Sequence, residues 1–282
     1  MKRKFKICSV ITLMCTLFSI SATYGKTIDP AVPNYEVKIY MDPSVVLNSN
    51  NRLNQDVLDY FDMPSTVTKM SAEYLDSRDL DLNNIGWDVR LRKMEDENNF
   101  ELTYKKRYAI ENGNIDASLQ TAAADGFDKS EGDYEAQVDW GYEKQTLSFS
   151  NNKDVSISGY DGMDLPSNTD AIKVAVNKIP GKLNDSISNG YGKTILKNAH
   201  VYGPVEAKRS IGVFYEQKFY IEVWKIKTES GNGYDYVVEA SFKTDDRSDA
   251  QEGHDKLIAL LKEKRWLLPK DELKTQMILN RY

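Results

Sequence analysis

Residues 74–93, YLDSRDLDLNNIGWDVRLRK, and residues 99–107, NFELTYKKR, carry the most informative pattern in the chain. They predict the end of a strand, a one-turn helix and a β-hairpin. Successive side chains of a strand point to opposite faces of the sheet. The hairpin is therefore expected to have one apolar face and one face crowded with cations. The charged face carries Asp88, Arg90, Arg92, Glu101, Thr103, Lys105 and Arg107, and the apolar face carries Val89, Leu91, Leu102 and Tyr104.

The same charged alternation recurs in segments far away in the sequence. Strands are predicted at Asn34–Tyr40, Val205–Tyr215, Lys218–Lys227 and Tyr234–Lys243. An antiparallel sheet can leave one face in water, so an open sheet with a solvated charged face is one solution. The other solution is a sheet that closes on itself and keeps the charges inside. The inward set would then also include Glu36, Lys38, Glu206, Lys208, Glu222, Glu239, Ser241 and Lys243.

We expect an α+β fold in which about eight strands form a closed antiparallel β-barrel with helices packed outside it. Residues 249–264 form the best covering helix, because Leu257, Leu260 and Leu261 lie on one stripe and lysines on the other. A barrel of roughly eight strands encloses space for one small ligand. The prediction is one domain, residues 26–282, with an insertion near residues 125–190.

The N-terminus has the features of a secretory signal peptide. Four cations between Lys2 and Lys6 precede an apolar run, Ile7–Ile20, and small residues follow it. Cleavage is expected after Ala22 or Gly25, so residues 1–25 would be removed and the protein would be secreted or extracytoplasmic. An uncleaved anchor is the alternative, although the apolar run is short for a membrane span.

Both cysteines, Cys8 and Cys15, lie inside this predicted signal peptide. A mature protein without cysteine excludes thiol catalysis and zinc–thiolate sites. Removing the four cations would change the formal net charge from −6 to −10. So acidic a protein is a poor candidate for binding nucleic acid or an anionic membrane. An anionic ligand would need a local basic pocket, and we expect no stable membrane insertion after cleavage.

Cations and carboxylates on the inner face of a barrel suggest a site for a polyanion together with a divalent metal. Arginine forks and lysine ammonium groups bind phosphate oxygens. Carboxylates hold Mg²⁺ or Mn²⁺, which neutralises charge and polarises a phosphoryl group.

Three blocks of the sequence resemble the CYTH, or triphosphate tunnel metalloenzyme, family. They are Glu36-x-Lys38 in the first strand, the block from Tyr74 to Lys105, and the last strand with Glu239, which a long helix follows. The resemblance implies an antiparallel barrel whose lumen binds triphosphates with divalent metal. It implies phosphate-binding roles for Lys38, Arg90, Arg92 and Lys105. In the strand Val205–Tyr215, the alternation of side chains favours Lys208 as a further inward, phosphate-binding residue, and Arg209 is the alternative. The resemblance also implies catalytic and metal-binding roles for Glu36 and Glu239, and Glu222 is a further candidate metal ligand.

Two positions depart from the family pattern. The opening Glu-x-Glu-x-Lys motif reads Asn34-Tyr35-Glu36-Val37-Lys38 here, and the terminal Glu-x-Glu reads Glu239-Ala240-Ser241. Two expected carboxylates are thus neutral.

Three functions remain open on the sequence alone. The first is a secreted, Mg²⁺- or Mn²⁺-dependent hydrolase of small-molecule triphosphates or polyphosphates. The second is a non-catalytic module that binds such anions, which the neutral Asn34 and Ser241 favour. The third is a structural domain at the cell surface.

Overall fold

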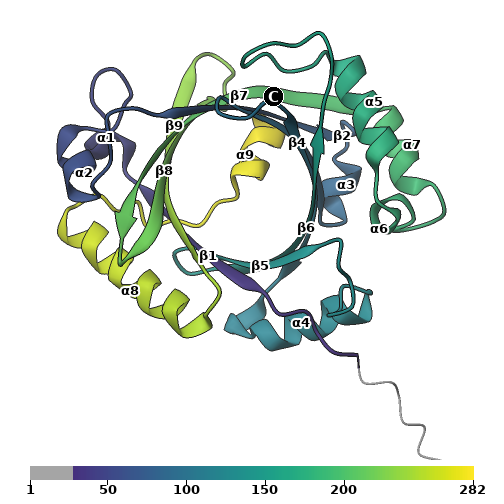
Figure 1. The fold of residues 1–282 in the computed structure, drawn as a ribbon, viewed down its shortest axis with the longest axis horizontal. Helices are drawn as coiled ribbons and strands as arrows, with labels where there is room; N and C mark the ends of the chain where they lie inside the picture. Colours follow the sequence, from purple (N-terminus) through teal and green to yellow (C-terminus); the bar gives the residue numbers. More distant parts are fainter. Residues whose placement is uncertain (1–27) are drawn as a thin grey trace, which may run out of the picture.

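The computed structural model describes residues 28–282, so the predicted signal peptide lies outside the described residues. Nine strands form one closed barrel in the ring order β1-β5-β6-β4-β3-β2-β7-β8-β9 (Figure 1). The strands are β1 (Asn34–Met41), β2 (Thr68–Asp76), β3 (Trp87–Met94), β4 (Phe100–Ala109), β5 (Glu135–Trp140), β6 (Gln145–Val155), β7 (His200–Phe214), β8 (Gln217–Lys227) and β9 (Tyr234–Thr244).

The closed barrel and its helical cover confirm the α+β prediction, but the strand number and the pairing differ. Strand directions can alternate all the way round a ring only if the number of strands is even. With nine strands, one neighbouring pair must be parallel, and that pair is β1 with β5. The barrel is therefore mixed rather than fully antiparallel.

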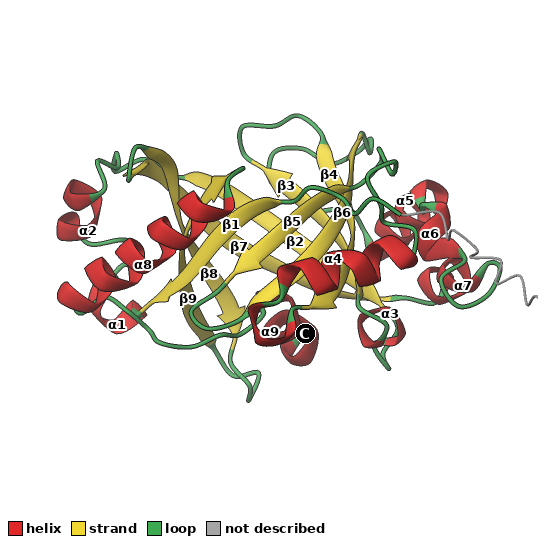
Figure 2. Cartoon of the chain, turned by 90° about the horizontal axis from the view of Figure 1, so that it is seen from below, coloured by secondary structure: helices red, strands yellow, loops and turns green. Residues whose placement is uncertain are grey.

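Most helices lie outside the barrel, as Figure 2 shows from the side. No helix among residues 28–282 has both the length and the apolar composition needed to cross a membrane. The helices are α1 (Pro43–Val46), α2 (Gln55–Tyr60), α3 (Asp81–Asn84), α4 (Ile115–Ala124), α5 (Asn168–Lys178), α6 (Gly181–Asn184), α7 (Tyr191–Lys197), α8 (Arg247–Glu263) and α9 (Lys274–Arg281), with a 3₁₀ turn at Glu111–Gly113.

The main hydrophobic core lies between the outer face of the barrel and these helices. Val37, Leu91 and Phe242 are buried there, on the side of their strands that the alternation assigns to the outside. Helix α8 covers β1 and β9 with the leucine stripe that the sequence predicts, and Leu257 is fully buried. Tyr104 also points outward, and its hydroxyl donates a hydrogen bond to the backbone oxygen of Ala175 in α5 (2.6 Å).

The segment predicted as an insertion, residues 125–190, divides into two parts. Its strands β5 and β6 belong to the barrel and fill the gap between β1 and β4. The later part forms α5 and α6, which lie with α7 outside the barrel, and contacts of α5 and α7 reach β7 and β2.

Helix α9 is the exception to the outer cover, because it closes one end of the lumen (Figure 1). Met277 and Ile278 are buried against inward-facing residues of the barrel, among them Tyr74 and Trp224, in a second apolar cluster. This position departs from the expectation that helices pack only outside the barrel. The apolar stripe of α9 packs inside because the lumen wall is itself apolar at this end.

The contact of α8 with β9 leaves no room for a side chain at Gly253. A Cβ at this position would lie 2.4 Å from the Phe242 ring. We expect Gly253→Ala to reduce the free energy of unfolding by about 1–3 kcal/mol, because an overpacked core must shift side chains or backbone. Urea unfolding measures this, and Gly132→Ala, in an exposed loop with open space around it, is the matched control. Equal losses in the two variants would contradict the prediction.

Candidate binding site in the barrel lumen

The lumen holds a cavity of about 730 Å³. All nine strands and the segment that leads into α9 contribute to its wall. This volume is in the range of small-molecule sites. The wall contains ten Lys or Arg and nine Asp or Glu side chains, so it is highly charged but almost balanced rather than simply basic.

Seven of the eight site residues predicted from the sequence line this cavity. The exception is Lys208, and its neighbour Arg209 lines the cavity instead, so the predicted parity of β7 was wrong. At this height the inward side of β7 is apolar, because Val205 and Ala207 pack in the inner cluster beside α9. The seven predicted residues that line the cavity are Glu36, Lys38, Arg90, Arg92, Lys105, Glu222 and Glu239.

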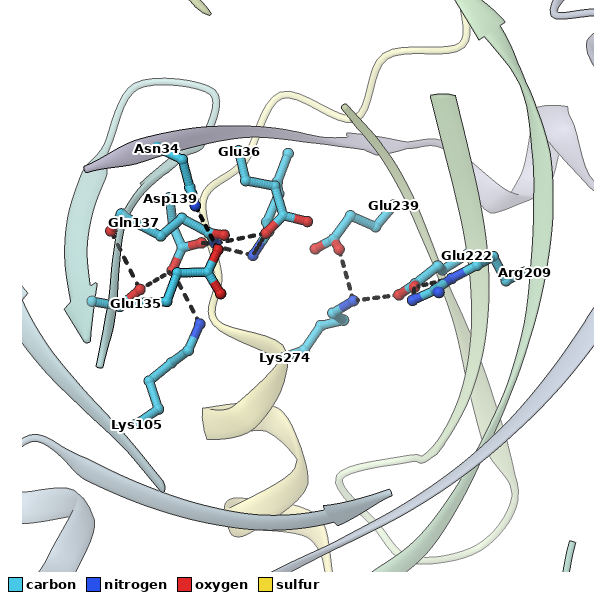
Figure 3. A network of polar contacts seen from close by, with 12 residues as sticks. Asn34, Glu36, Lys105, Glu135, Gln137, Asp139, Arg209, Glu222, Glu239 and Lys274 are labelled. Carbon is cyan, nitrogen blue, oxygen red and sulfur yellow. Dashed lines mark hydrogen bonds and ion pairs between the residues drawn. The ribbon is translucent and has the colours of Figure 1, made fainter. Parts of the chain in front are cut away.

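The parallel pair of β1 and β5 builds the first charged cluster. Glu36 stands opposite Asp139 in the register (Figure 3). Lys38 Nζ lies 2.9 Å from Glu36 Oε2 and 2.8 Å from Asp139 Oδ1. Gln137 donates to both carboxylates, at 2.7 and 2.6 Å. Burial would lower the pKa of Lys38, but the two carboxylates outweigh it and raise that pKa well above its usual value. Lys38 is therefore charged and already paired.

Asp139 and Gln137 were missed in the sequence. The alternation of polar and apolar residues could have identified them, since Gln137 and Asp139 alternate with Ala136 and Val138, which are buried. They were missed because the segment was assigned to an insertion, and no local pattern tells that β5 pairs with β1.

The β3–β4 hairpin supplies the second cluster. Arg90 and Arg92 share one carboxylate, Glu101, at 2.8 and 2.7 Å. Burial by itself would raise the pKa of Glu101. The two arginines outweigh burial and lower that pKa to about 2. Burial and the nearby charge of Arg90 lower the pKa of Arg92, because one glutamate does not compensate two guanidinium groups. The hairpin wall also carries Lys105, and Arg107 paired with Asp88.

Lys105 is the least compensated of the predicted phosphate-binding cations that line the cavity. Its ammonium lies 3.8 Å from Asp139 Oδ2, and that carboxylate is held more closely by Lys38. Burial, together with the charges of Lys38 and Arg90, lowers the pKa of Lys105 against the opposing effect of Asp139. A further anion beside Lys105 would relieve this imbalance.

The third cluster joins β7, β8, β9 and α9. Glu222 and Glu239 are direct neighbours across the β8–β9 pair. Lys274 Nζ lies 3.1 Å from Glu222 and 2.7 Å from Glu239 (Figure 3). Arg209 binds the other oxygen of Glu222 through Nε and Nη2, at 2.9 and 2.7 Å. Lys274 was not predicted from the sequence, since nothing in a short terminal helix indicates that it enters the barrel.

The carboxylates of the lumen do not fit a resident divalent cation in this arrangement. Among residues 28–282, no group of three or more His, Cys, Asp or Glu side chains is placed to hold a metal ion. The three expected ligands are each paired with a lysine, Glu36 with Lys38, and Glu222 and Glu239 with Lys274. The neutral Asn34 and Ser241 add no carboxylate. Asn34 instead donates to Glu135.

Comparison with known proteins finds similarity only among solved structures. No protein-family model matches the chain, and neither does any curated protein sequence. A Hippeastrum protein described as having a dominant triphosphatase activity has a TM-score of 0.49 and 10% identity, over 86% of this chain and 93% of its own. A candidate adenylate cyclase from Bacillus halodurans has a TM-score of 0.49 and 12% identity, over 88% and 96%. A conserved hypothetical protein from Pyrococcus furiosus has a TM-score of 0.43 and 10% identity, over 87% and 99%. With identities this low, the function of this chain has to be argued from its own residues.

Proposed function

We propose that this protein binds a small-molecule triphosphate or polyphosphate in the lumen of its barrel, with the phosphates against the β3–β4 hairpin. The predicted signal peptide supports an extracytoplasmic setting for this binding. The observation that carries the proposal is the charge on that wall. Four cations stand there against two carboxylates, namely Arg90, Arg92, Lys105 and Arg107 against Asp88 and Glu101.

Unsatisfied donors on the same wall support an anionic ligand. Within the described part of the chain, the Nε atoms of Arg90, Arg92 and Arg107 are buried without a hydrogen-bond partner. Buried polar groups in proteins are almost always paired, so such donors require an explanation. A ligand rich in acceptor oxygens would let these side chains turn and satisfy their donors, and phosphate is the group that guanidinium forks bind best.

Titration calorimetry with inorganic tripolyphosphate tests the proposal. In buffer with EDTA, we expect saturable binding that is about tenfold or more tighter than that of orthophosphate, because each additional charge-assisted contact contributes about 1.5–3 kcal/mol. Sulfate, a single compact dianion, is the control. Absence of tripolyphosphate binding, by calorimetry and by thermal shift, would overturn the proposal.

The hydrolase hypothesis differs from this proposal in one measurable outcome, the release of orthophosphate. It assigns catalysis to Glu36 and Glu239 with Mg²⁺ or Mn²⁺, and both side chains face the cavity. Incubation of the bound tripolyphosphate with either metal separates the two. Metal-dependent release indicates a hydrolase, and binding without release indicates an anion-binding module.

A further inference from the structure

The most unusual cation of the lumen comes from α9 rather than from a strand. Lys274 is the first residue of α9, and its ammonium lies between Glu222 and Glu239. All three side chains are deeply buried, with exposed fractions of 17%, 11% and 8%. The ammonium also lies 4.4 Å from the centre of the Trp224 ring. Lys274 thus brings one positive charge to two carboxylates that would otherwise repel each other.

The acceptors around Lys274 are nearly saturated. Arg209 occupies one oxygen of Glu222, and the indole N–H of Trp224 and the ammonium of Lys274 share the other, at 2.8 and 3.1 Å. A divalent cation at the same point would have to displace the ammonium or lie beside it. Like charges a few ångströms apart in a site of low dielectric repel each other strongly.

Contacts at both ends of α9 hold Lys274 in this place. Before the helix, the carboxylate of Asp271 accepts hydrogen bonds from the backbone N–H groups of residues 142, 143 and 144, in the β5–β6 turn. The Tyr40 hydroxyl donates to the backbone oxygen of Glu272 (2.6 Å). At the other end, Arg281 donates to the backbone oxygen of Lys227 and to Asp235. Displacing the ammonium would therefore require moving an anchored segment or turning a buried side chain.

From this arrangement we infer that Lys274 is a built-in cation that occupies the place of a divalent metal between Glu222 and Glu239. The lumen then binds its anion without a metal at this pair of carboxylates. This deepens the proposed function and rests on it for the identity of the anion. The inference also gives a role to Glu222 and Glu239, which do not pair with the cations of the β3–β4 hairpin.

Removing the ammonium should create a metal site. Lys274→Met keeps an unbranched apolar stem and leaves Glu222 and Glu239 without their shared cation. Titration of the full purified protein with Mn²⁺, followed by electron paramagnetic resonance in phosphate-free buffer, measures the change. We expect wild type to show no saturable binding, and Lys274→Met to bind Mn²⁺ with an affinity about tenfold or more above the wild-type limit. In the variant Glu239 has lost its cation and Glu222 keeps only Arg209, so the two carboxylates attract a divalent cation.

Two controls make the test specific. Lys256→Met removes a lysine that pairs with a glutamate, Glu252, on the outer surface of α8 (2.7 Å), and it should titrate like wild type. The double variant Lys274→Met with Glu239→Gln should lose the gained site. A folded Lys274→Met that gains no Mn²⁺ binding overturns the inference.

The inference is also overturned if wild type binds Mn²⁺ saturably and Glu239→Gln abolishes that binding. If Lys274→Met does not fold, this comparison of wild type with Glu239→Gln decides alone, and equal, unsaturable titrations support the inference. The proposed function is tested separately, with tripolyphosphate in EDTA. Failure of phosphate binding and failure of the metal test are therefore distinguishable.

Discussion

When the pH is raised from 4.5 to about 8, the free energy of unfolding of Glu73→Gln should increase by about 3 kcal/mol relative to that of wild type. Glu73 lies in β2 and faces away from the lumen, opposite Leu91. Only 3% of it is exposed, and within residues 28–282 its Oε1 atom has no hydrogen-bond partner. Burial raises the pKa of this carboxyl from 4.5 to about 7.

The direction follows from proton binding. Between pH 4.5 and 7, the unfolded chain has released this proton while the folded protein still holds it. The stability associated with the neutral carboxyl is therefore fully present below pH 4.5 and is lost as the pH rises to about 7. A glutamine at this position is neutral throughout, so the variant avoids that loss.

Urea unfolding of both proteins at the two pH values measures the effect, and the difference between variant and wild type isolates Glu73 from other groups. Glu95→Gln is the control. Glu95 is exposed and paired with Lys69, and hydrogen bonds from Lys69 lower its pKa. Its difference from wild type should stay constant over this pH range. A Glu73→Gln difference that does not change with pH would show that the folded protein tolerates the ionised carboxylate.

The hairpin of residues 87–107 was the most predictable part of the site. Once Leu91 is assigned to the core, alternation places Arg90 and Arg92 on the other face without further information. The same reasoning, applied to several strands, predicts the closed barrel. Charges of both signs on one face of a sheet are better placed around an enclosed ligand than on the exposed face of an open sheet. The sequence therefore predicts this wall residue by residue.

Prediction failed where the lumen itself is apolar. In β7 the polar residues Glu206 and Lys208 point out and the apolar Val205 and Ala207 point in, the reverse of the alternation in β3. The reversal is caused by α9, which fills that end of the barrel and requires apolar partners. An amphipathic pattern shows that two faces differ, but not which of them is inside. The position of Lys274 could not be predicted for the same reason.

Lys105→Met should weaken tripolyphosphate binding about 10- to 150-fold, which corresponds to about 1.5–3 kcal/mol. Lys105 belongs to the wall with excess positive charge, and its one carboxylate neighbour at 3.8 Å is held more closely by Lys38. A phosphate oxygen would thus gain a charge-assisted bond without breaking a good ion pair. Removing Lys105 should also disturb the fold less than removing Lys38 or Arg90, which each have a close carboxylate partner.

Lys208→Met is the matched control, because it removes the same charge from the outer face of the barrel. Both lysines belong to the same closed sheet, so each variant lowers the long-range attraction of the anion by one charge, and salt screens that attraction. Only a direct contact in the lumen distinguishes them. Calorimetry in EDTA should therefore show wild-type affinity for Lys208→Met and the full loss for Lys105→Met. Equal affinities in the two variants would mean that tripolyphosphate does not bind at the β3–β4 wall, and a loss confined to Lys208→Met would place the anion on the outside of the barrel.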